Sequence, residues 1–173
     1  QLTNMRSAGA EELDTLLSSG EQISSSLLAG AIIELGIKAR SWLGWQIPIL
    51  TNNNYNSSSI IEIKTDEVLK FISKRGIAIV AGFQGVSMGN RITTLGRGGS
   101  DLSAVAIAKF FKADSCEIYT DVEGVLTTDP SINNKAKKID KISYEEMLEM
   151  SSLGAKVMQP SAVQSSMIED IPI

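Results

Sequence analysis

Nine consecutive residues say most about the fold of this chain: TTLGRGGSD, at positions 93–101. They follow an apolar run at 77–82 that predicts a buried strand, and they lead into an apolar helical segment at 102–111. Glycines let the backbone approach a ligand closely, and the free N–H groups and dipole of a helix start favour an anion. Arg97 adds a planar, permanently charged group suited to a carboxylate or a phosphate. The stretch therefore predicts an anion-binding turn between a strand and a helix.

A simpler interpretation of the same stretch is a tight turn in which Ser100 or Asp101 caps the following helix. This interpretation explains the serine and the aspartate. It does not explain why Arg97 is flanked by three glycines.

Composition limits the classes of function. The chain has 173 residues, of which 43% are hydrophobic and 21% charged, as expected of one globular domain. A net charge of −4 argues against nucleic-acid binding, and no apolar run approaches the roughly 20 residues that span a membrane. The single cysteine, Cys116, predicts a buried, reduced thiol in a cytoplasmic protein.

The chain contains no histidine. The usual general base, Ser-His nucleophiles and His-ligated metal sites are therefore excluded. Any chemistry must rely on carboxylates, lysine, arginine and backbone amides.

Strand-like and helix-like segments alternate along the chain. Helices are predicted at 9–35 with an interruption at 18–20, from 66 to near 76, and at 101–111, 143–153 and 161–168; strands are predicted at 37–45, 60–63, 77–82 and 116–120. Ser143 and Glu146 have the spacing of a capping box. The alternation predicts an α/β fold with a largely parallel sheet covered on both faces.

A second loop follows the predicted strand 116–120. Residues 120–130 are rich in hydroxyls and carboxylates and include a glycine, so their backbone could hold a nucleotide base and ribose. In open α/β sheets ligands bind beyond the carboxyl ends of the strands, where this loop lies. Lys156 could reach a phosphate, although neither a P-loop nor a dinucleotide fingerprint is present.

Several motifs in this order and spacing resemble the aspartate kinase family of the amino-acid kinase superfamily. They are GFQG at 82–85, TTLGRGGSD at 93–101, TDVEG at 120–124, TTDP at 127–130 and GAKV at 154–157, with SGE at 19–21 also fitting. The resemblance extends from about residue 18 to the end of the chain.

The resemblance implies a three-layer α/β/α domain with a mainly parallel sheet, of the carbamate kinase-like fold, here lacking its first strand. It implies ATP-dependent phosphorylation of L-aspartate to 4-phospho-L-aspartate with Mg²⁺, the first step toward lysine, threonine and methionine. L-aspartate and ATP would be the partners, with homo-oligomer formation left open.

The resemblance also implies roles for individual residues. Asp101 would be catalytic, and the substrate would be bound by Glu21, Arg97, Gly98, Gly99, Ser100 and Asp101. ATP would be bound by Thr120, Asp121, Leu126, Asp129, Pro130, Ser131, Lys156 and Val157. No protein ligand for a metal is implied.

The chain departs from the family pattern in three respects. The Lys-x-Gly-Gly-x-Ser phosphate loop of the family would precede Gln1, so residues 1–173 are expected to be an incomplete, inactive catalytic domain by themselves. Leu126 stands where the family has tyrosine, and Ser131 where it has arginine. No ACT regulatory domain is expected within these residues.

Two alternatives remain open at this point. One is another amino-acid kinase, such as a glutamate or acetylglutamate kinase. The other is a non-catalytic fragment that only binds a ligand or a partner.

Overall fold

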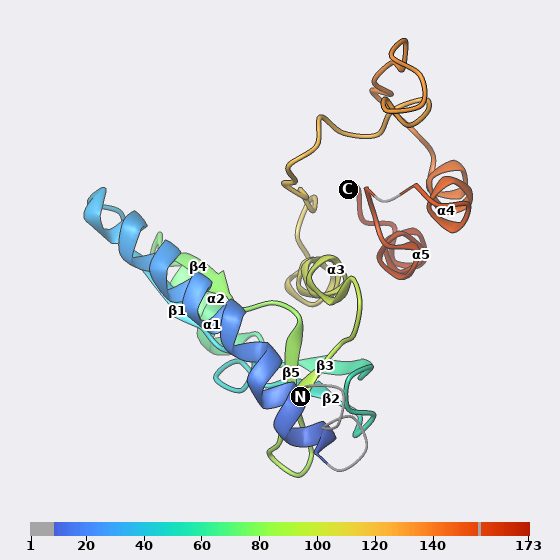
Figure 1. Ribbon diagram of the computed structural model, residues 1–173. Coiled ribbons are helices and arrows are strands. Elements are labelled where there is room, and N and C mark those ends of the chain that lie inside the picture. Colours follow the sequence, from blue (N-terminus) through green and yellow to red (C-terminus); the bar gives the residue numbers. More distant parts are fainter. Residues whose placement is uncertain (1–8, 156) are drawn as a thin grey trace.

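The computed structural model describes residues 9–155 and 157–173, in which a helix separates two runs of three strands and three helices follow the second run (Figure 1). The helices are α1 (Ala10–Glu34), α2 (Asp66–Ile72), α3 (Gly99–Phe111), α4 (Tyr144–Ser152) and α5 (Pro160–Glu169). The strands are β1 (Ala39–Trp42), β2 (Ile49–Thr51), β3 (Ile60–Ile63), β4 (Ile77–Val80), β5 (Gln84–Ser87) and β6 (Ile92–Thr94).

The strands form two sheets. One contains β1 and β4 in parallel, with Ala39 opposite Ile77 and Trp42 opposite Val80. The other has the order β3-β2-β5-β6, in which β2 and β5 are parallel while β3 and β6 join antiparallel. The predicted α/β class is confirmed, and parallel pairing links strands that are distant in sequence.

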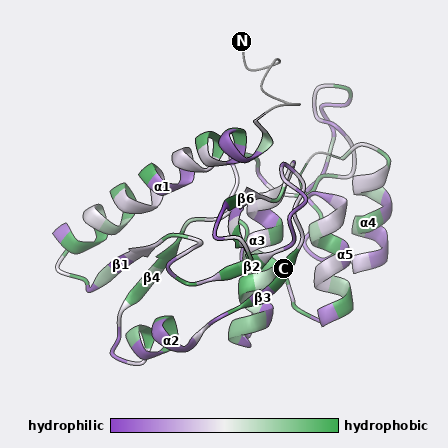
Figure 2. Cartoon of the chain, turned by 90° about the horizontal axis from the view of Figure 1, so that it is seen from below, coloured by the Kyte–Doolittle hydropathy of each residue, from purple (hydrophilic) through white to green (hydrophobic). Residues whose placement is uncertain are grey.

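Helices cover both faces of the β1–β4 pair. Figure 2 shows α1 on one side of these strands and α2 on the other. On the α2 side, a buried cluster joins the strands, α2 and α3 through Trp42, Ile47, Ile49, Ile63, Val68 and Ala106. These strands therefore lie between two helical layers, as the resemblance implies.

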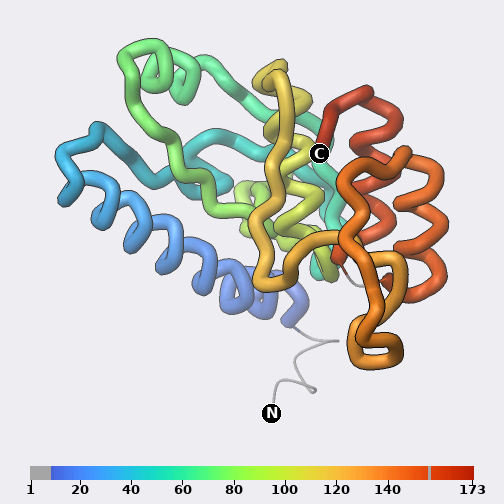
Figure 3. The backbone as a smooth tube through the Cα atoms, turned by 90° about the horizontal axis from the view of Figure 1, so that it is seen from above, coloured from blue at the N-terminus to red at the C-terminus, as the bar shows by residue number. Residues whose placement is uncertain are grey.

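Helix α3 connects this part of the molecule to the carboxyl-terminal helices. Figures 1 and 3 show α4 and α5 beside α3, on the side away from the sheets. A second buried cluster fills this contact, with Val105 and Ala108 of α3 against Met147 of α4 and Val163 of α5. The predicted helices at 101–111, 143–153 and 161–168 are thus confirmed, and α4 begins with the predicted Ser143–Glu146 capping box.

Helix α1 differs from its prediction in two ways. It runs unbroken through the serine and glycine at 18–20, and its polar face is the buried one. Asp14 and Ser18 are fully buried, whereas Ile23 is 62% exposed and Leu27 69% exposed. The cause is the polar surface beneath α1: the Gln22 amide donates to the side-chain oxygen of buried Gln84 at 3.4 Å, and the hydroxyl of buried Thr94 donates to Asp14 at 2.8 Å.

The region between β4 and α3 also differs from its prediction. Residues 82–98 are not one glycine-rich turn but contain the β5–β6 hairpin. Glycine is required within it at Gly85, because a Cβ there would lie 2.6 Å from the Ile49 carbonyl oxygen of β2.

The predicted strand 116–120 is the third difference. It forms no strand ladder with the described residues, although the Cys116 N–H donates to the Pro172 carbonyl at 2.8 Å. Cys116 is a buried free thiol, and burial raises its pKa with a smaller contribution from the charge of Asp101. Among the described residues, no helix is both long and apolar enough to cross a membrane.

Candidate active site

The glycine-rich turn opens α3 without a side-chain cap. Helix α3 starts at Gly99, and its N-cap residue is Gly98, in the left-handed conformation with a φ of 74°. The interpretation in which Ser100 or Asp101 caps this helix is therefore wrong. Because no side chain caps the helix, N–H groups of its first turn remain available to a ligand.

Close packing explains why glycines are needed in the turn. Gly96 and Gly98 both have positive φ, at 77° and 74°. A Cβ on Gly98 would lie 2.0 Å from Cγ of Gln159, and one on Gly99 would lie 2.8 Å from the ring of Phe83. The turn thus contacts the residue before α5 on one side and the β4–β5 connection on the other.

Phe83 and Ser103 support the turn, and neither has a role predicted from the sequence, although Phe83 lies in the GFQG motif at 82–85. Phe83 has a φ of 65°, which is unusual for a bulky residue and is common at functional sites. The Ser103 hydroxyl accepts from the Phe83 N–H at 2.8 Å and donates to the Gly99 carbonyl at 2.7 Å. The Phe83 carbonyl accepts from the Leu95 N–H at 3.0 Å. A serine inside an apolar helix carries no signal for such a role.

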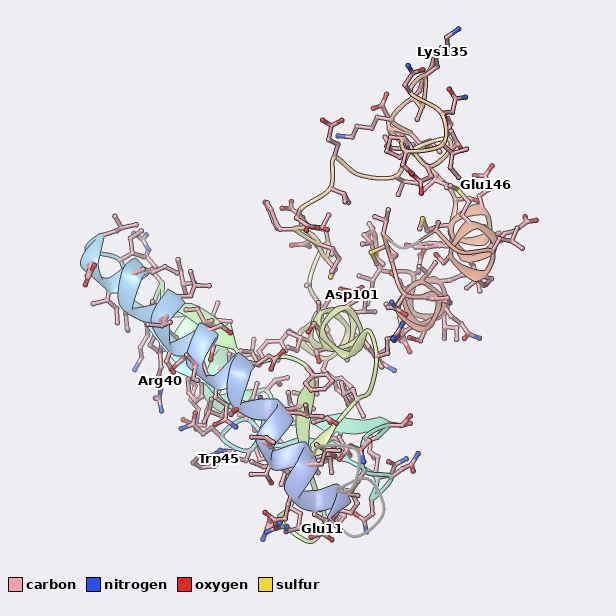
Figure 4. The ribbon with its side chains drawn as sticks, in the orientation of Figure 1. Glu11, Arg40, Trp45, Asp101, Lys135 and Glu146 are labelled. Atoms are coloured by element: carbon pink, nitrogen blue, oxygen red, sulfur yellow. The ribbon has the colours of Figure 1, made fainter. Side chains whose placement is uncertain are left out.

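The charged groups of the predicted substrate site are free of ion pairs. Arg97 is exposed and Asp101 is half-buried, and neither forms an ion pair within residues 9–155 or 157–173. Asp101 lies on α3, at the centre of the molecule (Figure 4). Arg97, Gly98, Gly99, Ser100 and Asp101 are brought together because they are consecutive; Ser100 is exposed and Gly99 is buried.

Glu21 comes to this region from α1. It is half-buried, one residue before Gln22, whose amide donates to the side-chain oxygen of Gln84 at 3.4 Å. Gln84 directly follows Phe83, which packs on Gly99. The helix face that carries Glu21 therefore packs on the start of β5, next to Phe83.

A mostly apolar cavity of about 220 Å³ lies between the loop after residue 116, the start of α4 and residues 157–158. It is lined by Ile118, Thr120, Gly124, Val125, Ile142, Ser143, Tyr144, Met147, Val157, Met158, Val163 and Ile173. Whole drug-sized ligands usually occupy roughly 300–1,000 Å³. The cavity is thus large enough for a planar base, with polar parts of the ligand remaining outside.

Only some of the predicted ATP-binding residues line this cavity. Thr120 and Val157 line it, and Lys156 lies outside the described residues. The remaining predicted ATP residues lie on the neighbouring loop and do not line the cavity: Asp121, Leu126, Asp129, Pro130 and Ser131. Tyr144 and Met147 of α4 line it and were missed, because a capping box and a methionine in a helix indicate only a helix start and a core.

The loop at 126–138, which carries most of the predicted ATP residues outside the cavity, is held together by its own hydrogen bonds. Leu126 pairs with Lys138 across an antiparallel bridge, and Thr127 N–H donates to the Lys137 carbonyl at 2.9 Å. At its tip, the Ser131 N–H and hydroxyl both donate to Oδ1 of Asp129, at 2.8 and 2.6 Å. Ser131 thus closes a local turn at the position where the family has an arginine.

Two further features define what the site contains. In the part of the chain that the structure describes, no group of three or more Asp, Glu, His or Cys side chains could hold a metal ion. A larger cavity of about 510 Å³, lined by Trp45, Leu50, Lys64, Val86 and Ile92 among others, involves none of the predicted site residues.

Comparisons with known proteins identify the family. The sequence model of the Amino acid kinase family matches residues 2–173. An aspartokinase of Rickettsia prowazekii is 53% identical over 161 residues, which are 93% of this chain and 36% of that protein. An aspartokinase of Geobacillus stearothermophilus is 49% identical over 162 residues, or 94% of this chain and 40% of that protein.

Solved structures give the same family. E. coli aspartokinase III in complex with aspartate and ADP matches with a TM-score of 0.86 and 32% identity, over 95% of this chain and 38% of that one. A UMP kinase from Bacillus anthracis shares the fold, with a TM-score of 0.64 and 21% identity. The chain spans less than half the length of these aspartokinases. On its sequence and its structure, the chain belongs to the amino acid kinase family.

Proposed function

We propose that this chain is part of the catalytic domain of an aspartate kinase, which transfers the γ-phosphoryl group of ATP to the side-chain carboxylate of L-aspartate. The observation that carries the proposal is the uncapped start of α3, with Arg97 on the turn before it and no ion pair to occupy that guanidinium within the described residues. Similarity to aspartokinases over more than nine tenths of the chain supports the choice of substrate.

In this proposal the turn binds and orients the amino-acid substrate. The Arg97 guanidinium pairs with a substrate carboxylate, and the N–H groups of Ser100 and Asp101 stabilise negative charge near the reacting group. Glu21, on the docked face of α1, would pair with the substrate ammonium. The side-chain carboxylate of aspartate then forms a bond to the γ-phosphorus as the bond to the ADP oxygen breaks, and ADP leaves.

No general base is needed for this transfer, because the attacking carboxylate is already ionised. Phosphoryl transfer depends mainly on positioning and on neutralising charge. A chain without histidine can therefore supply what the reaction requires. Asp101 would organise the reacting groups at the first turn of α3.

ATP would place its base in the 220 Å³ cavity, whose apolar lining from Val125, Tyr144 and Met147 suits an aromatic ring. Thr120 supplies a hydroxyl at the rim. The close contact between Gly98 and Gln159 joins the turn at 95–98, hereafter the substrate turn, to the segment 157–159 that borders this cavity. Mg²⁺ usually binds through substrate phosphates and one or two carboxylates, so the ion would enter the site together with ATP.

Assembly and location are further parts of the proposal. The exposed apolar face of α1, with Leu16, Ile23 and Leu27, supports homo-oligomer formation, because contiguous exposed apolar surface commonly marks an interaction site. Sedimentation of the full-length chain would measure its assembly. A cytoplasmic location remains a prediction.

Replacing Arg97 with alanine in the full-length protein tests the proposed function. Loss of a charged hydrogen-bonded pair costs about 1.5–3 kcal/mol, which corresponds to about a 10- to 150-fold fall in kcat/KM for aspartate. KM for ATP should stay within about twofold of the wild-type value. Acyl phosphate formation, trapped with hydroxylamine, gives both constants.

Arg40→Ala is the matched control, because Arg40 is exposed on β1 and stacks on Trp42, far along the chain from the turn. It should leave both KM values unchanged. Unchanged aspartate kinetics in Arg97→Ala together with a raised KM for ATP would contradict the assigned roles.

A further inference from the structure

Asp14 is a fully buried carboxylate in the first half of α1, and the proposed mechanism gives it no role. Its partners are hydrogen-bond donors, and it forms no ion pair with any residue that the structure describes. A buried carboxylate is costly unless its oxygens accept hydrogen bonds. The hydrogen bonds that Asp14 accepts therefore indicate its role.

Three donors from two other segments reach Asp14. The Thr94 N–H donates to Oδ2 at 2.7 Å, and the Thr94 hydroxyl donates to Oδ1 at 2.8 Å. The Asn56 N–H is shared between the two oxygens at 3.1 and 3.0 Å. Asp14 thus joins α1, the end of β6 and the polar loop between β2 and β3 at one point.

This point lies directly before the substrate turn. Thr94 is the last residue of β6 and stands three residues before Arg97. Its carbonyl accepts from the Ser58 N–H at 2.9 Å, so Asp14 and Ser58 together pair both backbone groups of Thr94. Asp14 fixes the residue from which the turn departs.

Asp14 also holds the loop on which the turn rests. Asn56 has a φ of 64°, and its N–H points to the Asp14 carboxylate. Its carbonyl oxygen would lie 2.9 Å from a Cβ on Gly96, so the loop and the turn are in close contact there. Movement of Asn56 would therefore be transmitted to Gly96, next to Arg97.

We propose that Asp14 is a positioning residue for the substrate turn: by accepting from Thr94 and Asn56, it holds Arg97 and the start of α3 where the acceptor carboxylate binds. This inference rests on the proposed function. It concerns the amino-acid substrate and not ATP, because Asp14 contacts neither the loop after residue 116 nor α4.

Asp14→Asn in the full-length chain tests the role with little change of shape. A carboxylate accepts at both oxygens, whereas an asparagine amide accepts at one position and donates at the other. With its nitrogen at the Oδ2 position, the amide would face the Thr94 N–H, which can only donate. With its nitrogen at the Oδ1 position, the Thr94 hydroxyl would have to turn to accept, and the Asn56 N–H would keep only one of its two acceptors. We expect KM for aspartate to rise at least tenfold while KM for ATP stays within twofold. Thr94→Val, which lacks the hydroxyl, should shift in the same direction, and Thr94→Ser should restore most of the loss.

Leu13→Ala is the matched control. Leu13 is the buried neighbour of Asp14 on the same helix, and its apolar side chain cannot form a hydrogen bond with the turn. It should lower the melting temperature and leave both KM values within twofold. Equal rises in both KM values for Asp14→Asn, or no rise in either, would show that Asp14 only stabilises α1 and would overturn the proposal.

Hydrogen exchange separates this inference from the proposed function. In Asp14→Asn, protection over residues 94–97 should fall at least tenfold relative to the amide of Val105 in α3, and Leu13→Ala should not produce this difference. If the wild-type protein does not phosphorylate aspartate, the proposed function fails, and the exchange result still decides whether Asp14 holds the turn. An equal loss of protection at residues 94–97 and at the Val105 amide in Asp14→Asn would refute the positioning role of Asp14.

Discussion

Replacing Gly98 with alanine should destabilise the turn for two reasons, both of which come from the added Cβ atom. Gly98 is the N-cap of α3 and has a φ of 74°, a conformation that L-residues with a Cβ adopt at a cost of about 1–2 kcal/mol. The added Cβ would also lie 2.0 Å from Cγ and 2.7 Å from Cβ of Gln159. Because Cβ of Gln159 cannot rotate away, the backbone must move as well.

The two effects give an expected loss of unfolding free energy. Overpacking of this kind costs about 1–3 kcal/mol, so the total is about 2–5 kcal/mol. Relief of the overlap should be visible in Gly98→Ala/Gln159→Ala, which removes Cγ and Cδ of Gln159. The double variant should regain about 1 kcal/mol, since contacting residues are usually non-additive by about 0.5–3 kcal/mol.

Urea unfolding of the full-length protein measures these differences, and kinetics with varied aspartate measure the effect on the site. Gly30→Ala is the matched control: Gly30 lies inside α1, and a Cβ there would meet no atom within 4 Å. That substitution should stabilise the protein by about 0.5–1 kcal/mol. A loss below about 1 kcal/mol for Gly98→Ala, with unchanged KM for aspartate, would refute the geometry assigned to the turn.

Four other predictions concern the loop at 126–131, the capping box of α4 and the chain itself. Leu126→Tyr or Ser131→Arg should tighten ATP binding in a calorimetric titration, because each restores a side chain that the family has there; no gain from either would mean that the loop differs in geometry. Ser143→Ala should reduce the unfolding free energy by about 0.5–2 kcal/mol through loss of the cap. The backbone N–H and hydroxyl of Ser143 lower the pKa of Glu146, so the stability advantage over Glu146→Gln should be complete above the unfolded-state pKa and disappear as pH falls through the lower folded value. Residues 1–173 expressed alone should form no acyl phosphate, since the positive group on the family's lysine loop is not among them; turnover equal to that of the full-length protein would contradict this.

The sequence predicted the elements whose structure is determined by local chemistry. Helix α3, the capping box at Ser143 and the helix predicted at 161–168, which is α5, depend on neighbouring residues, and all three are confirmed. The glycines at 96 and 98 were likewise predictable, because a left-handed turn requires them locally. The anion-binding character of the turn remains a prediction from the same few residues.

Features that depend on distant partners were not predictable in this way. The hairpin β5–β6 contains Gln84 and Gly85, which do not favour a strand by themselves, and it is formed by pairing with β2. The buried face of α1 is polar because Gln84 and Thr94 lie beneath it, so its leucine stripes do not indicate the core. Asp14 was missed for the same reason, because an acid near a helix start is ordinarily exposed and stabilises the dipole.

The central claim is that L-aspartate supplies the acceptor carboxylate. Phosphorus-31 NMR of the full-length protein with Mg-ATP tests this most directly. L-aspartate, L-glutamate and N-acetyl-L-glutamate would be supplied separately at equal concentration. We expect an acyl phosphate resonance and ADP formation with aspartate, and neither above background with the other two acids. An acyl phosphate formed from glutamate or N-acetylglutamate but not from aspartate, or none from any of the three, would contradict the account.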